Sequence, residues 1–140
     1  MTGEILVATD GSRGAVRGVE YALNEARRNE ARLHVVSVVD GRRHGTAGAF
    51  TSMEIALDAH EQQARAHAEE IVDLATEHDL DAVALTLRGH PHEAILKYAT
   101  DQDVDLIVLG EHGLSRRVST NPRSTTSRVE AEADRPVYIA

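Results

Sequence analysis

Short, largely apolar runs alternate with longer segments of mixed polarity along the whole chain. The runs cover residues 4–9, 33–39, 81–87, 105–109 and 136–140, and a glycine follows each of the first four within two residues. A short run without regular polar alternation predicts a strand that is buried on both faces. The pattern therefore predicts five strands, of which the first four end in turns.

The four segments between these strands have apolar residues at helical spacing. The first helix is predicted to follow Ser12, a good N-cap residue, and the second to open with the capping pair Thr51 and Glu54. Pro91 lies in the first turn of the third helix, and the fourth covers residues 124–133. The spacing also predicts the inner face of the long second helix, which would consist of Ala64, Ala68, Ile71 and Ala75.

Alternating strands and helices, with strands that are apolar throughout, predict an α/β fold with a parallel sheet covered by helices on both faces. The 140 residues are enough for one domain, and the sequence shows no internal repeat or domain boundary. In such sheets ligands bind outside the carboxyl ends of the strands. Chemistry is therefore expected at the turn after Thr9, at the turn after Val38 and in the loop that begins at Gly110.

Composition narrows the possible functions. The chain has no cysteine, which excludes disulfides, thiolate metal sites and a cysteine nucleophile, and fits a reducing compartment. It has no secretory leader pattern and no run of about 20 apolar residues, so we expect a cytoplasmic protein without a membrane partner. A net charge of -8 argues against nucleic acid as a partner. The single lysine beside fourteen arginines suits a GC-rich genome or a salt-rich cytoplasm equally well.

The main candidate site is the segment that follows the fourth strand. Gly110 and Gly113 permit close backbone approach to a ligand, and Ser124–Thr126 open a helix whose N-terminal amides and dipole favour an anion. Residues 110–128 contain four arginines and one glutamate, a local charge of +3. The segment thus favours a phosphate group. The plainer alternative is that the glycines end a strand, the arginines are solvated and the hydroxyls cap the last helix.

Three stretches together resemble the universal stress protein family. They are the strand and acidic turn Val7–Ser12, the turn Gly89-His90-Pro91, and the glycine loop. ATP-binding members of that family carry glycine, two residues, glycine, nine residues, then glycine and a serine or threonine. Here Gly110, Gly113 and Ser124 match, whereas Arg123 stands where the third glycine is expected. The resemblance extends over residues 5–139.

The resemblance implies a three-layer, Rossmann-like fold with an open sheet in the strand order 3-2-1-4-5. It also implies an adenine nucleotide, ATP with Mg²⁺ or AMP, and a homodimer formed through the C-terminal strand. Asp10 would lie near the ribose or the metal, with a turn residue that caps the first helix as the alternative. The implied nucleotide-binding residues are Ala8, Thr9, Asp10, Val38, Leu109, Gly110, Gly113, Arg123, Ser124, Thr125 and Thr126. Val38 would act through its backbone, and it is equally well explained as a core strand residue.

Arg123 leaves the occupancy of this site open. If the third glycine is needed for a positive φ or for close approach, an arginine there costs binding. If its side chain swings outward, the guanidinium can pair with a phosphate instead. Three functions follow: a nucleotide-binding stress-response dimer, an interaction dimer that has lost ATP binding, and a slow ATPase or autokinase.

The eight histidines do not form a metal-binding pattern. His90, His92 and His112 lack an acidic partner at ligand spacing, so they are interpreted as surface residues. His60 and His67 are seven residues apart and share one face of the long helix, where solvated polar positions are expected.

Overall fold

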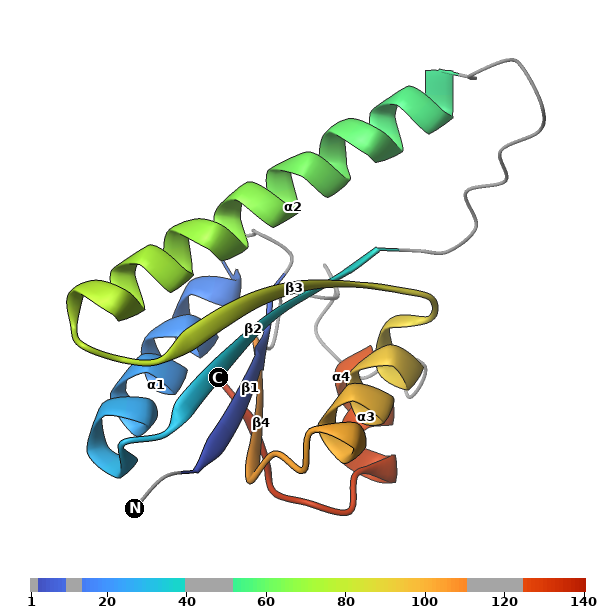
Figure 1. Ribbon diagram of the computed structural model, residues 1–140. Helices are drawn as coiled ribbons and strands as arrows, with labels where there is room; N and C mark the ends of the chain where they lie inside the picture. The colour runs from blue at the N-terminus through green and yellow to red at the C-terminus, as the bar shows by residue number, and fades with distance from the viewer. Residues whose placement is uncertain (1–2, 10–13, 40–51, 111–124) are drawn as a thin grey trace.

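The centre of the structure is a sheet of five parallel strands, seen in a computed structural model that describes residues 3–9, 14–39, 52–110 and 125–140 (Figure 1). Side chains are described for all of these except 14–16 and 52–61. In chain order the elements are β1 (Glu4–Ala8), α1 (Gly14–Asn29), β2 (Arg32–Val39), α2 (Ser52–Glu77), β3 (Ala82–Arg88), α3 (Pro91–Asp101), β4 (Leu106–Leu109), α4 (Thr125–Glu132) and β5 (Val137–Ile139).

The strands lie in the order β3-β2-β1-β4-β5, which confirms the predicted topology. β1 is central and pairs with β2 on one side and with β4 on the other. In this register Ala8 lies beside both Val36 and Leu109, so the carboxyl ends of β1 and β4 are level with one another. From β1 the chain adds β2 and β3 toward one edge of the sheet and then β4 and β5 toward the other edge. The change of direction between β1 and β4 creates the switch point where ligands of such folds bind.

Helices cover both faces of the sheet, as the apolar strands require (Figure 1). On one face, α1 and α2 pack over Ile5, Val7, Leu33 and Val35. On the other, α3 and α4 pack over Leu6, Ala8, Val36 and Ile107. Successive residues of β1 thus enter opposite cores, which explains why this strand has no polar face.

The predicted elements match in type and differ at their ends. All four residues that were predicted for the inner face of α2 are buried: Ala64, Ala68, Ile71 and Ala75. Pro91 begins α3 as expected, and His90 before it has an extended conformation. Gly89 has a φ of +126°, a backbone angle that residues with a side chain rarely adopt. β1 ends at Ala8 rather than Thr9, and β5 is shorter than predicted. Ser12 and Thr51 lie outside the described residues.

A buried polar chain links β1, β2 and α3 inside the second core. His34 on β2 is 2% exposed, and its Nδ1 lies 2.7 Å from the Tyr98 hydroxyl while its Nε2 lies 3.3 Å from Glu4 Oε1. With the ring proton on Nε2, the Tyr98 hydroxyl donates to Nδ1 and Nε2 donates to the carboxylate. Every polar atom of the imidazole is then satisfied, which a buried histidine needs.

Candidate functional site

The carboxyl ends of β1 and β4 bring four of the predicted site residues to one edge of the sheet. Ala8, Leu109 and Gly110 are buried, and Thr9 is 1% exposed. The Thr9 amide donates to Val36 O at 2.9 Å, and Leu109 O accepts from the Ala140 amide at 2.9 Å. These backbone bonds fix the position from which the loops after β1 and β4 depart.

Val38 lies on β2 near the same edge, and its half-buried side chain packs against the second core with α3 and α4. The Val38 side chain is therefore part of the core packing. A ligand at this edge could therefore use the backbone of Val38 but not its side chain. The neighbouring Val39 O already accepts a hydrogen bond from the Gly89 amide at 3.0 Å, which ties the glycine turn before α3 to the end of β2.

Gly18 is a residue of this edge that the sequence reasoning missed. A Cβ added to Gly18 would lie 3.4 Å from the Gly110 amide nitrogen and 3.5 Å from the carbonyl carbon of Leu109. The first half of α1 therefore passes close over the start of the loop after β4. A glycine on the otherwise apolar inner face of a helix is the only sequence signal that could have suggested this contact.

The first turn of α4 supplies the hydroxyl groups of the candidate site. Thr125 is half-buried at the first helical position, and Thr126 is 2% exposed at the second. The Thr126 Oγ1 atom is buried and has no hydrogen-bond partner within the part of the chain that the structure describes. A buried polar atom without a partner costs free energy and needs an explanation. Its place in the first turn of a helix is one where an anion would bind.

Four predicted site residues lie outside the described ranges: Asp10, Gly113, Arg123 and Ser124. Of the predicted set, the structure therefore brings together Ala8, Thr9, Leu109 and Gly110 at one edge, and it places Thr125 and Thr126 at the helix start that follows the loop. The roles of all these residues remain predictions.

His92, in the first turn of α3, has a side chain that is 14% exposed and lies near two carboxylates. Its Nε2 lies 3.9 Å from Glu93 Oε1 and 3.9 Å from Glu132 Oε2, so it links α3 to α4. Within residues 3–9, 14–39, 52–110 and 125–140, no three His, Asp or Glu side chains are grouped closely enough to hold a metal ion. No described helix is long and apolar enough to cross a membrane.

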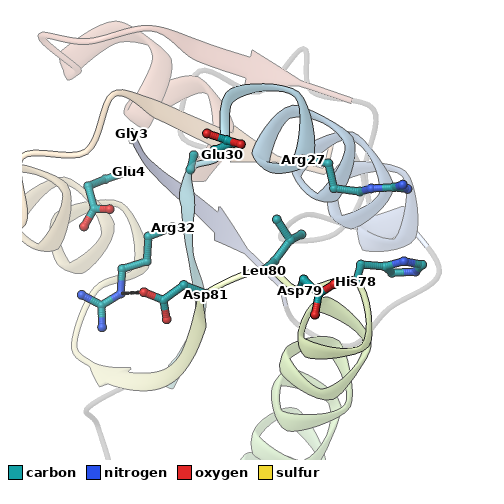
Figure 2. A pocket seen from close by; sticks show the side chains of 10 residues that line it. Gly3, Glu4, Arg27, Glu30, Arg32, His78, Asp79, Leu80 and Asp81 are labelled. Carbon is teal, nitrogen blue, oxygen red and sulfur yellow. Dashed lines mark ion pairs between the residues drawn. The ribbon is translucent and has the colours of Figure 1, made fainter. Parts of the chain in front are cut away.

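A cavity of about 570 Å³ opens at the opposite edge of the sheet, where the strands begin (Figure 2). Figure 2 shows Arg32 and Asp81 facing each other on one side of it, 3.4 Å apart, with Arg27 and His78 on the other. The Arg32 and Asp81 side chains are both well exposed, so their ion pair is weak. Because α/β sheets bind ligands at the carboxyl ends of their strands, we do not assign the site to this cavity.

Comparison with known proteins gives a family for the whole chain. A sequence model described as "Universal stress protein family" matches residues 1–140. The chain is 36% identical over 138 residues to "Universal stress protein in QAH/OAS sulfhydrylase 3'region" of Thermus aquaticus, with 96% of each chain covered. The structure of universal stress protein UspA from Lactobacillus plantarum matches with a TM-score of 0.84 at 28% identity, covering 98% of this chain and 96% of that one.

Two further solved structures share the fold and contain nucleotides. One is a universal stress protein in complex with cAMP, with a TM-score of 0.72 and 21% identity over 99% of this chain and 96% of that one. The other is the universal stress protein from Archaeoglobus fulgidus in complex with dAMP, with a TM-score of 0.63 and 20% identity over 98% of this chain and 96% of that one.

Proposed function

The chain belongs to the universal stress protein family, and we propose that it is a stress-response module that binds an adenine nucleotide at the carboxyl edge of its sheet. The adenine would lie against Ala8, Thr9 and the backbone at Val38. The phosphates would lie between Gly110 and the first turn of α4. The proposed ligand is ATP with Mg²⁺ or AMP, and the solved structures of two proteins with the same fold are complexes with cAMP and dAMP.

The observation that carries this proposal is the buried, unpartnered hydroxyl of Thr126 in the first turn of α4. A phosphate oxygen in this turn would accept a hydrogen bond from that hydroxyl and from amides at the start of the helix. The close contact between Gly18 and Gly110 supports it further, since it holds the start of the phosphate loop against α1 without any intervening side chain.

Calorimetry with ATP, AMP and Mg²⁺ tests the proposal. Saturable heat and adenine absorbance in protein purified without added nucleotide are the expected results. No heat at millimolar ligand would refute nucleotide binding and would favour the interaction dimer instead. A phosphate-release assay no faster than buffer would exclude the slow ATPase.

Arg123→Gly distinguishes the two possible effects of the arginine that stands at the third glycine position of the family pattern, which are phosphate binding and obstruction of the loop. If the arginine holds a phosphate, the variant binds more weakly and its affinity depends less on salt. If the arginine obstructs the loop, the variant binds more tightly. Arg117→Gly, which removes the same charge from the same loop outside the family pattern, is the matched control.

We also propose that the protein forms a homodimer through β5. This strand is at the edge of the sheet, and its Tyr138 is 41% exposed and stacks on Tyr21 with ring centroids 3.6 Å apart. An open edge strand readily pairs with a second copy.

Light scattering should give twice the monomer mass for the natural chain and the monomer mass for Tyr138→Lys. Leu74→Lys, at the other large exposed apolar residue of the described part, should remain dimeric. A monomeric natural chain at micromolar concentration would contradict this arrangement.

A further inference from the structure

A second cavity, of about 270 Å³, lies between α1 and α2, the two helices that cover one face of the sheet (Figure 1). The residues that line it are Val19, Glu20, Leu23, His67, Glu70, Ile71 and Leu74. It shares no residue with the candidate nucleotide site. Since an apolar cavity of about 150 Å³ can hold benzene, this one has room for a single ring with a short side chain.

The apolar part of the lining consists of four aliphatic side chains, two from each helix. Val19 and Ile71 are buried, and Leu23 packs against the first core, so they form a firm floor. Leu74 is 42% exposed at the rim of the cavity. An apolar ligand body would cover it and gain the free energy of removing that surface from water.

The polar part of the lining contains only groups that can accept hydrogen bonds. Glu20 and Glu70 are exposed carboxylates, and no arginine or lysine lines the cavity within the described residues. His67 was expected to be solvated, but its side chain is 29% exposed and its Nε2 is buried. His67 Nδ1 lies 4.0 Å from Glu70 Oε2, which is beyond hydrogen-bond distance, and Nε2 has no hydrogen-bond partner among the described residues. In the tautomer with the ring proton on Nδ1, Nε2 is an acceptor.

We infer that this α1–α2 cavity binds a small primary amine with an apolar body, such as an arylalkylamine or a short alkylamine. The body would lie against the four aliphatic side chains. The ammonium group, which has three donors and a positive charge, would match Glu20, Glu70 and, after a small rotation of its ring, His67. A carboxylate ligand of the same shape would meet two like charges, and an alcohol would gain no ion pair.

The test compares three probes with one apolar body and different head groups: phenethylamine, 2-phenylethanol and 3-phenylpropanoate. Their binding is followed at pH 7 and low salt by the ¹³C methyl signals of Val19, Leu23, Ile71 and Leu74. We expect saturable shifts with phenethylamine, about fivefold weaker binding of the alcohol and still weaker binding of the carboxylate, because an exposed ion pair contributes up to about a fivefold change in affinity. Added salt should reduce the preference for the amine. Saturating ATP should leave it unchanged.

Matched variants identify the groups responsible. Glu70→Gln should bring the amine and the alcohol to within about twofold of each other, whereas Glu69→Gln, an exposed neighbour outside the cavity, should preserve the full difference. Leu74→Ala should weaken all three probes by a similar factor. His67→Phe should weaken the amine and the alcohol several-fold by removing the acceptor, and His78→Phe, beyond the end of α2, should weaken neither.

Three results would overturn the inference. One is the absence of any saturable shift with phenethylamine at millimolar concentration. Another is equal binding of the amine and the carboxylate, or equal effects of the Glu69 and Glu70 variants, since the head group would then not be recognised. The third is methyl shifts that follow protein concentration rather than ligand, which would show that a second copy of the chain covers this face. Loss of nucleotide binding would refute the proposed function and leave this inference standing.

Discussion

Replacing Thr126 with valine should stabilise the free protein and weaken nucleotide binding at the same time. The Thr126 hydroxyl is buried and, within the described part of the chain, has no partner, while the residue itself is 2% exposed in the second position of α4. Valine has nearly the same shape and a similar helix propensity. The exchange therefore replaces a desolvated hydroxyl group with a methyl group of similar size in the same space.

The magnitudes follow from the cost of an unmade hydrogen bond. Leaving a buried hydroxyl unpaired costs about 1–3 kcal/mol, so we expect Thr126→Val to raise the free energy of unfolding by about 1 kcal/mol. A domain of this size should then melt about 3 °C higher. A hydrogen bond from the hydroxyl to a phosphate would contribute about 1.5–3 kcal/mol, so the same variant should bind nucleotide roughly ten- to a hundredfold more weakly.

Urea denaturation without ligand and calorimetry with nucleotide measure the two effects separately. Thr126→Ser is the matched control, because it keeps the hydroxyl and removes the methyl group. Serine should retain nucleotide binding while lowering stability, the reverse of valine on both counts. If valine destabilises the free protein, the hydroxyl has a partner in the folded chain and the reasoning fails. If valine stabilises it but binds nucleotide normally, the hydroxyl is unpaired for a reason other than this ligand.

The remaining predictions concern the loop contact and the buried polar chain. Gly18→Val should weaken nucleotide binding several-fold, because a Cβ at this position would already be in van der Waals contact with the Gly110 amide at 3.4 Å and valine adds two methyl groups beyond that contact; Arg17→Ala, an exposed neighbour, should leave calorimetric affinity unchanged. Tyr98→Phe should lower the free energy of unfolding in urea by about 1–2 kcal/mol, since it leaves His34 Nδ1 buried without a donor; an unchanged midpoint would contradict the assigned bond. Burial raises the pKa of Tyr98 above 10.0, so its contribution to stability is complete below pH 10 and is lost as the pH rises through the raised value; Tyr98→Phe should show a smaller loss between pH 9 and 11 in the same assay.

The strands, the helices and their buried faces could be predicted because they depend on patterns that are local in sequence. Ala64, Ala68, Ile71 and Ala75 recur every three or four residues, so their burial needs no knowledge of what covers them. The predicted sheet edge follows similarly, because each parallel strand ends where its apolar run ends. The strand order needed the family resemblance, since alternation alone allows several orders of the same five strands.

Contacts between distant residues could not be predicted in this way. His34 occupies a position that the strand pattern marks as buried, but its partners Glu4 and Tyr98 are 30 and 64 residues away. Either partner could have been an apolar residue without changing the pattern. Gly18 is similar, since its role depends on how closely α1 passes over β4.

His67 shows a position whose burial helical periodicity does not predict. It precedes the buried Ala68 by one residue and follows the buried Ala64 by three, so it lies at the border of the inner stripe of α2. A residue at such a border is solvated when no other helix lies beside it and partly covered when one does. α1 supplies Val19 and Leu23 next to it, and Leu74, seven residues along the same border, lines the same cavity. The sequence predicted a solvated His67, and the position of α1 instead makes it part of the wall of a cavity with an acceptor and two carboxylates.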